Sequence, residues 1–273
     1  MIVIVVARPS SVPAFAVPEL LPSPIFSGGP TVPAPAPLTV AVAQPACAEP
    51  GRPDTVAVNV ERHAAAVREA GAARLVVFPE LSLTGYDLAA PSVDPSDERL
   101  APLVAACAAT GATALVGAPV TDPDGRDFIA TIAVTGEGAA VACRKTNLYG
   151  NEPERFAAAE RPALLELDGW RLGLAICADA ADPGHAERLV GLGAEAYVAS
   201  TLYGAGPEAL ATKAARYPAR AADNGVWVVL ATAAGPSGEF AASSGGSGVW
   251  APDGSEVAKA GTGTGEVVTA VLG

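Results

Sequence analysis

From residue 38 to the C-terminus, short apolar runs alternate with segments of helical periodicity, and this alternation constrains the fold most strongly. The runs are rich in Val, Ile and Leu and end at turn-forming residues, which is typical of strands. Interleaved strands and helices predict the α/β class, and adjacent late strands without helices between them predict a partly antiparallel sheet. We expect strands at 38–43, 74–78, 114–117, 128–134, 139–143, 171–176, 196–199, 226–232, 248–251 and 266–272, and helices at 54–72, 97–110, 185–192 and 207–222.

Residues 1–37 differ from the rest of the chain in composition. They contain nine prolines and two charged residues, Arg8 and Glu19. Such segments favour an extended backbone without hydrogen-bonded partners. We therefore expect a Pro-rich, poorly ordered extension over 1–37 and one domain over 38–273. A start codon assigned too far upstream would produce the same pattern.

The charge balance excludes several classes of partner. The 273 residues include 29 acidic and 17 basic side chains, for a net charge of -12. Nucleic acids and anionic membrane surfaces both require clustered basic residues, so we expect neither as a partner. No apolar run approaches the roughly 20 residues of a membrane-spanning helix. Only two histidines occur, His63 and His185, which argues against a His-based zinc site, and we expect no metal or cofactor.

Glu80 follows an apolar run and a proline, at a position where α/β proteins gather binding groups. A glutamate there could act as a general base if burial raised its pKa. Taken alone, an ordinary solvated loop carboxylate is the simpler interpretation.

Lys145 ends another strand, beside Arg144, and adjacent strand residues point to opposite faces. A buried lysine must be paired or neutral, and it would suit the stabilisation of an oxyanion. The alternative is a lysine that protects a sheet edge from aggregation.

Cys177 ends a nearly pure apolar strand and is followed by small residues. This pattern is similar to a turn that presents a nucleophile at the top of a sheet. The alternative is a cysteine that packs as a small hydrophobic residue. We prefer that alternative for Cys47, Cys107 and Cys143.

Taken together, these segments resemble the nitrilase, or carbon–nitrogen hydrolase, superfamily. The matching segments are 78–86 (FPELSLTGY), 144–152 (RKTNLYGNE), 173–177 (GLAIC), 220–229 (RAADNGVWVV) and 245–254 (GGSGVWAPDG). Glu80, Lys145 and Cys177 follow each other at spacings of 65 and 32 residues. The resemblance covers the chain from residue 38 onward. It implies an α-β-β-α sandwich of two mixed sheets flanked by helices, as a homodimer or higher homo-oligomer.

The resemblance also implies a Glu-Lys-Cys triad. Cys177 is then the nucleophile, Glu80 the general base and Lys145 the cation that stabilises the oxyanion. Glu152 matches a further glutamate that helps to position the site, and Glu154 is the less favoured candidate for that role. The expected reaction is hydrolysis of a non-peptide carbon–nitrogen bond in a small carboxamide, releasing ammonia through a cysteine thioester. Alternatives are hydrolysis of an N-carbamoyl amine or amino acid, nitrilase activity, or a catalytically silent binding module.

Two positions depart from the family pattern. Ala178, whose backbone N–H would be a second oxyanion donor, stands where many members have an aromatic residue, and Asn147 stands where many have histidine. Both departures lie beside the expected pocket, so they affect the expected substrate more than the expected reaction. The shape of that pocket depends on the loops near Tyr86, Tyr149 and Tyr203.

A Cys–His hydrolase that uses His185 is a further alternative. The spacing of eight residues from Cys177 places this histidine at the start of the next helix, where a capping or surface role is simpler. We expect a cytoplasmic location, because a working thiol suits a reducing compartment.

Overall fold

The computed structural model describes residues 35–273. Five α-helices in this part of the chain are α1 (Thr55–Glu69), α2 (Ala101–Thr110), α3 (Ala178–Ala181), α4 (Pro183–Gly191) and α5 (Pro207–Asn224). Short 3-10 helices cover Glu98–Leu100 and Glu152–Glu154. The strands are β1 (Leu38–Gln44), β2 (Leu75–Val77), β3 (Thr113–Thr121), β4 (Asp127–Thr135), β5 (Gly138–Arg144), β6 (Ala163–Leu167), β7 (Trp170–Ile176), β8 (Ala196–Thr201), β9 (Trp227–Thr232), β10 (Ala234–Ser237), β11 (Phe240–Ser244), β12 (Gly248–Trp250), β13 (Glu256–Lys259) and β14 (Glu266–Leu272).

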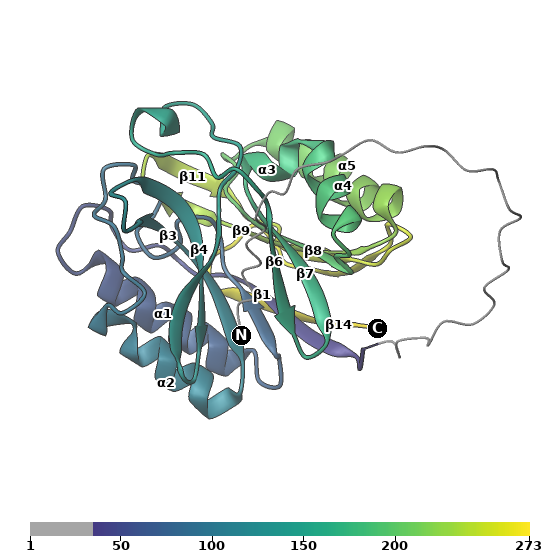
Figure 1. Cartoon of the computed structure of the whole chain (residues 1–273), viewed down its shortest axis with the longest axis horizontal. Coiled ribbons are helices and arrows are strands. Elements are labelled where there is room, and N and C mark those ends of the chain that lie inside the picture. The colour runs from purple at the N-terminus through teal and green to yellow at the C-terminus, as the bar shows by residue number, and fades with distance from the viewer. Residues whose placement is uncertain (1–34) are drawn as a thin grey trace, which may run out of the picture. The chain divides into compact units, whose positions relative to one another are not determined.

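Two six-stranded sheets form the centre of the described domain (Figure 1). The first has the order β14-β1-β2-β3-β4-β5 and the second the order β13-β12-β9-β8-β7-β6. In each sheet three central strands are parallel, namely β1-β2-β3 and β7-β8-β9, and the outer strands are antiparallel. Strands β10 and β11 form a separate two-stranded ribbon. The predicted α/β class with partly antiparallel sheets is confirmed.

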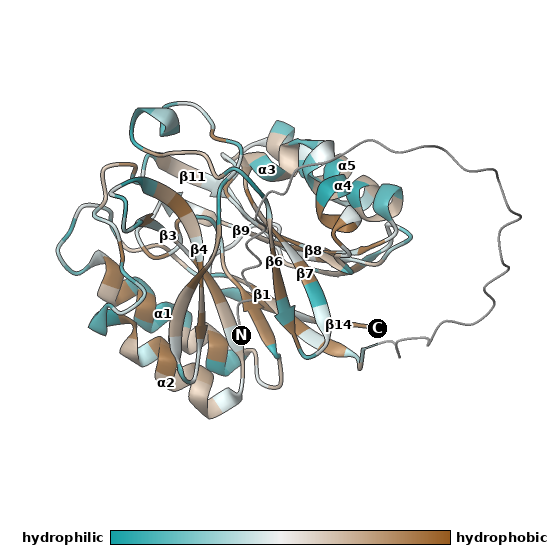
Figure 2. Ribbon diagram, viewed as in Figure 1, coloured by the Kyte–Doolittle hydropathy of each residue, from teal (hydrophilic) through white to brown (hydrophobic). Residues whose placement is uncertain are grey.

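Alternation along the strands divides the apolar core into layers. In β1, Val40 and Val42 pack into the cluster between the two sheets, whereas Ala41 and Ala43 pack into the cluster beneath α1 and α2. Successive strand residues point to opposite faces, so a continuous apolar run can serve two layers at once. The brown colour of the central strands in Figure 2 shows this continuity.

Helices cover the outer face of each sheet (Figure 1). Helices α1 and α2 pack on the first sheet through Val60, Val67 and Leu103. Helices α4 and α5 pack on the second sheet through Leu189 and Tyr217. The predicted α-β-β-α sandwich is therefore confirmed.

Several elements differ from the prediction. Strands β6, β10, β11 and β13 and the one-turn helix α3 were not predicted. All four strands are edge or ribbon strands with Gly, Pro, Ser or charged residues, and such sequences resemble loops. Helix α4 begins at Pro183 rather than His185, because the Asp182 carboxylate accepts a hydrogen bond from Gly184 N at 2.9 Å and Pro183 occupies the first turn.

Most of the predicted extension at 1–37 lies outside the described residues. Residues 35–37 have no regular secondary structure, and the Trp170 indole N–H donates to Ala36 O at 2.8 Å.

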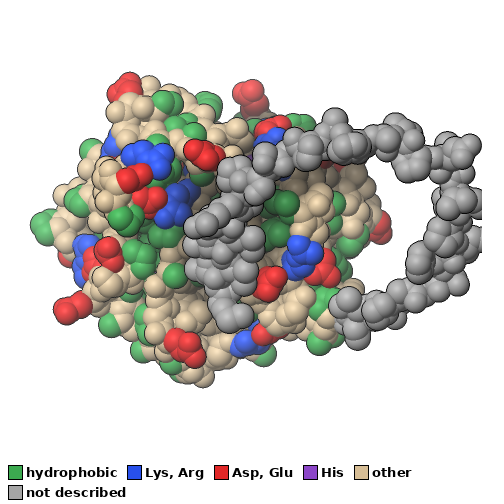
Figure 3. Space-filling model, in the orientation of Figure 1, with side chains coloured by type: hydrophobic (Ala, Val, Ile, Leu, Met, Phe, Trp, Pro, Cys, Tyr) green, Lys and Arg blue, Asp and Glu red, His purple; other side chains and the backbone are tan. Residues whose placement is uncertain are grey.

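Among the helices of residues 35–273, none is both long and apolar enough to cross a membrane. On the face drawn in Figure 3, acidic and basic side chains lie close to one another with small apolar areas between them.

Gly117 in β3 leaves the space that the turn after β2 occupies. A Cβ atom at this position would lie 2.3 Å from Leu81 N and 2.9 Å from the Glu80 carbonyl carbon. Both contacts are with backbone atoms, which cannot rotate away as a side chain could. The absence of a side chain at Gly117 therefore fixes how closely the Glu80 turn approaches the first sheet.

We expect Gly117→Ala to lower the free energy of unfolding by about 1–3 kcal/mol, the usual cost of overpacking. Urea unfolding measures this change. Gly191→Ala is the matched control, because a Cβ atom there meets nothing within 4 Å and it lies at the end of α4. Equal stability of the two variants would contradict the steric argument.

Candidate active site

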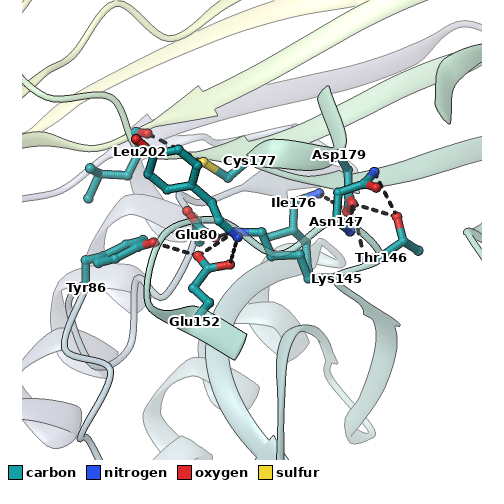
Figure 4. Close-up of polar contacts among 11 residues, drawn as sticks. Glu80, Tyr86, Lys145, Thr146, Asn147, Glu152, Ile176, Cys177, Asp179 and Leu202 are labelled. Carbon is teal, nitrogen blue, oxygen red and sulfur yellow. Dashed lines mark hydrogen bonds and ion pairs between the residues drawn. The ribbon is translucent and has the colours of Figure 1, made fainter. Parts of the chain in front are cut away.

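Three predicted site residues stand just beyond the ends of strands. Lys145 directly follows β5 and Cys177 directly follows β7, while Glu80 lies three residues beyond β2. Backbone pairing continues past the strands, because Lys145 N donates to Ile129 O at 2.8 Å and Cys177 N donates to Ser200 O at 2.9 Å. The two sheets thus hold these positions rigidly, and Figure 4 shows their side chains converging.

The ammonium group of Lys145 bridges two carboxylates. Its Nζ donates to Glu80 Oε1 at 2.6 Å and to Glu152 Oε1 at 2.7 Å, and all three side chains are completely buried. Tyr86 OH also donates to Glu152 Oε1, at 2.6 Å, and Tyr149 N donates to Glu152 Oε2 at 2.8 Å. Glu152, the predicted supporting residue, therefore contacts Lys145 directly, whereas Glu154 is exposed.

The second oxygen of Glu80, Oε2, has no hydrogen-bond partner of ordinary geometry among the described residues. The thiol of Cys177 lies near enough for the two groups to shift each other's pKa. Burial raises the pKa of Glu80, and the neighbouring Glu152 adds to this, while Lys145 opposes it. The carboxyl group of Glu80 thus has one oxygen bound to Lys145 and one oxygen without a hydrogen-bond partner among the described residues.

The Cys177 thiol is protonated at neutral pH. Burial raises its pKa well above the ordinary value, the Glu80 carboxylate raises it further, and Lys145 offsets only part of this. For Lys145, burial alone would lower the pKa, but Glu80, Cys177 and Glu152 raise it overall, so the amine stays an ammonium. The resting site therefore combines a neutral thiol with the ammonium group of Lys145.

Backbone strain marks two of these positions. Cys177 has φ 47° and Leu81, next to Glu80, has φ 50°, and Asp168 is the other non-glycine residue with positive φ in the described chain. Residues other than glycine rarely adopt this backbone conformation, and backbone strain of this kind is often found at functional sites. The Sγ atom of Cys177 lies 3.6 Å from Leu202 O.

Asp179 ties the turn of Cys177 to the loop after Lys145. Its Oδ2 accepts from Ile176 N at 3.0 Å, and its Oδ1 accepts from Thr146 N at 3.1 Å and from Asn147 N at 2.7 Å. One carboxylate thus holds the residue before the cysteine and the two residues after the lysine. Asp179 was not among the residues predicted from the sequence, although an acidic residue in an otherwise small and apolar turn is a signal of such a role.

A cavity of about 280 Å³ opens over Cys177 and Ala178. Its wall includes residues from the three loops that the sequence analysis assigned to the pocket. Aromatic and aliphatic side chains dominate it, and one cationic side chain contributes. The wall is formed by Tyr86, Tyr149, Leu202, Tyr203, Arg216 and Phe240.

The alternative nucleophile partner, His185, lies elsewhere. It is buried, and its Nδ1 is 3.2 Å from Tyr197 OH. The expected capping or surface role is therefore wrong, because Asp182 caps the helix and His185 lies on its buried face.

Cys107 and Cys143 are buried, and all four cysteines are free thiols. Within residues 35–273, no three His, Cys, Asp or Glu side chains gather as a metal site.

Comparison with known proteins agrees with this geometry. The family model described as carbon-nitrogen hydrolase matches residues 39–272. The chain belongs to the carbon-nitrogen hydrolase family. It is thus an enzyme of the nitrilase superfamily that acts on carbon–nitrogen bonds, as the sequence analysis predicted.

Individual relatives of this carbon–nitrogen hydrolase include amidases. The "hydrolase in pqqF 5'region" of Pseudomonas protegens is 36% identical over 78% of this chain and 76% of its own length. An (R)-stereoselective amidase of a Pseudomonas species is 31% identical over 54% of this chain and 56% of its own. A cysteine-to-alanine mutant of the Nesterenkonia AN1 amidase has a similar structure, with a TM-score of 0.74, 27% identity, and coverage of 89% of this chain and 93% of that chain.

We expect Asp179→Asn to lower both stability and turnover. The amide keeps the shape of the carboxylate but presents N–H groups to backbone N–H donors, and a buried unpaired donor costs about 1–3 kcal/mol. Thermal unfolding and kcat would be measured together. Asp223→Asn, an exposed change on α5, is the control. An Asp179→Asn enzyme as stable and active as this control would contradict the positioning role.

Proposed function

We propose that this carbon–nitrogen hydrolase cleaves small carboxamides to ammonia and a carboxylic acid through a thioester on Cys177. The observation that carries the proposal is the buried Glu80–Lys145 pair beside Cys177, beneath one cavity. Amidase relatives support it. The Nesterenkonia amidase, 27% identical, has been solved in complex with butyramide, and another of its structures shows the acetamide moiety of fluoroacetamide bound to its active-site cysteine.

Acylation begins when Sγ of Cys177 attacks the amide carbon. Glu80 Oε2 takes the thiol proton as the carbon–sulfur bond forms, and the carbonyl π electrons move onto oxygen. The Lys145 ammonium and the backbone N–H of Ala178 stabilise this oxyanion. The carbon–nitrogen bond then breaks, Glu80 returns the proton to nitrogen, and ammonia leaves.

Deacylation uses the same groups with water as the nucleophile. Glu80 takes a proton from water as the water oxygen attacks the thioester carbon. Lys145 and the Ala178 N–H stabilise the second oxyanion. The carbon–sulfur bond breaks, and the departing sulfur receives the proton from Glu80. The products are the carboxylic acid and the original thiol, so the cycle consumes one water and needs no redox partner.

Glu152 positions Lys145 in this scheme and does not touch the reacting atoms. It accepts hydrogen bonds from Lys145, Tyr86 and Tyr149 N, so it holds the ammonium between two carboxylates. The two neighbouring glutamates raise the pKa of Lys145, so the ammonium group keeps its proton. It acts as a fixed positive charge rather than as an acid.

Ammonia release from a panel of amides, N-carbamoyl compounds and nitriles tests the proposal, with Cys177→Ala alongside. We expect release from amides by the native enzyme and none from the variant, because sulfur is the nucleophile. Cys107→Ala, which changes a buried cysteine in the core of α2, is the matched control and keeps turnover. Release only from carbamoyl compounds or only from nitriles would replace carboxamides as the substrate class, and turnover by Cys177→Ala would refute the mechanism.

The pH dependence follows from Glu80. The reaction needs its carboxylate form, and burial raises its pKa from the ordinary 4.5. For a neutral amide, kcat/KM should therefore fall as pH drops through an apparent pKa above 4.5, which belongs to the coupled carboxylate cluster. The Cys177 thiol has a raised pKa, so no loss of activity from its ionisation is expected near neutral pH.

Steady-state kinetics on butyramide between pH 4 and 9 would measure this profile. An acidic limb at or below 4.5 would contradict a buried carboxylate base. Glu80→Gln is the companion variant, since it keeps the shape and the hydrogen bond to Lys145 but cannot accept the proton.

A small-molecule amide as the substrate is part of the function proposed here. The homodimer or higher homo-oligomer and the cytoplasmic location stay predictions.

A further inference from the structure

A buried arginine on α5 contacts the turn after Cys177 but has no place in the mechanism above. Arg220 is only 7% exposed, and its Nη2 donates to Ala180 O at 3.1 Å. Among the described residues it forms no ion pair with a carboxylate, and its Nε has no hydrogen-bond partner. A buried cation is costly unless negative charge lies nearby, so the surroundings of Arg220 must supply that charge.

Asp179 is the buried anion that matches it. Its oxygens accept from backbone N–H groups and from Thr146 Oγ1, the latter at 2.6 Å, and no cationic side chain of residues 35–273 contacts it. Burial is the largest influence on the pKa of both His185 and Tyr197; beyond it, Asp179 raises each of these pKa values and Arg220 lowers each of them. The two opposite charges therefore lie close to the same buried side chains.

The same two charges hold helix α3 from both sides. Asp179 is the second residue of this helix and ties it to Ile176 N, while Arg220 ties its third residue, Ala180, to α5. A helix of four residues has little stability of its own, so contacts from outside must fix it. Its first residue, Ala178, carries the N–H that the mechanism directs at the oxyanion.

Resting on the proposed thioester mechanism, we propose that Arg220 is a positioning residue that acts as a pair with Asp179. The pair fixes α3, so that the sulfur of Cys177 and the N–H of Ala178 face the same carbonyl group of the substrate. Opposite charges attract strongly in buried surroundings even without direct contact, because little water screens them. Arg220 does not line the cavity, so it acts only through the helix.

Steady-state kinetics of Arg220→Gln on butyramide test the positioning role. We expect kcat to fall on the order of 10- to 100-fold with little change in KM, because the reacting groups move while the cavity wall stays in place. Arg220→Lys should lose less, since its charge remains near Asp179. Arg68→Gln, an exposed change on α1 that alters the net charge equally, is the control. A change in KM alone, or a kcat equal to that of the control, would overturn the role.

A double-mutant cycle tests whether the two residues act as a pair. Asp179→Asn/Arg220→Gln should lose less kcat than the product of the two single losses, by on the order of 10-fold, because neither charge is then left without the other. Losses that simply multiply would overturn the pairing. Circular dichroism at the assay temperature checks folding. If Arg220→Gln does not fold, Arg220→Met, with an apolar side chain, takes its place.

Alkylation of Cys177 separates this inference from the proposed function, because it requires the thiol but no hydrolysis. Iodoacetamide is added to the native enzyme, Arg220→Gln and Arg68→Gln, and the peptide that contains Cys177 is followed by mass spectrometry. We expect alkylation of Arg220→Gln to be slower on the order of 10-fold. Slower alkylation supports the positioning role even if no amide is hydrolysed, an outcome that would refute only the amidase proposal. A rate equal to that of Arg68→Gln would overturn the role of Arg220.

Discussion

The fully buried ammonium of Lys145 is the interaction on which the rest of the site depends. A cation without solvent is stable only where carboxylates surround it closely, and removing one partner of such a pair typically costs about 3–5 kcal/mol. Glu80 and Glu152 meet this need from two different segments, so β2, β5 and the turn at Glu152–Glu154 must come together. The same contact leaves Oε2 of Glu80 without a hydrogen-bond partner among the described residues.

Two further charged side chains, Arg155 and Asp179, hold the loops around this cluster. Arg155 donates from Nη1 to Leu88 O at 2.7 Å and to Ala90 O at 2.6 Å, and from Nε to Asp127 Oδ2 at 2.8 Å. It therefore fastens the turn of Glu152 to the loop that carries Tyr86. Asp179 performs the corresponding task for the cysteine turn. Each loop of the site is thus tied to a neighbour by a side chain that does not face the cavity.

Prediction from sequence succeeded where one strand and its end contained all the information. The runs before Glu80, Lys145 and Cys177 are apolar, and their ends are visible in the sequence, so these positions could be proposed together. Asp179 and Arg216 could not be found in this way. Asp179 accepts hydrogen bonds from backbone N–H groups more than 30 residues away, and the sequence does not show this proximity. Arg216 differs from other arginines only because it lines the cavity that α5 helps to form. The β10–β11 ribbon was missed because its Gly, Pro and Ser residues resemble a loop.

The Lys145 cluster and the cavity wall arise from different parts of this fold. Lys145 and Cys177 directly follow strands and Glu80 lies three residues beyond one, so the sheet hydrogen bonds and the layered core fix their positions, and a shift there would disturb the buried charges. The cavity wall comes instead from loop residues such as Tyr203, from Arg216 on α5 and from Phe240 on the ribbon. None of these three side chains hydrogen-bonds to Glu80, Lys145 or Glu152, whereas Tyr86, which also lines the cavity, donates to Glu152. Ala178 belongs to both parts, because it directly follows Cys177 and also lines the cavity.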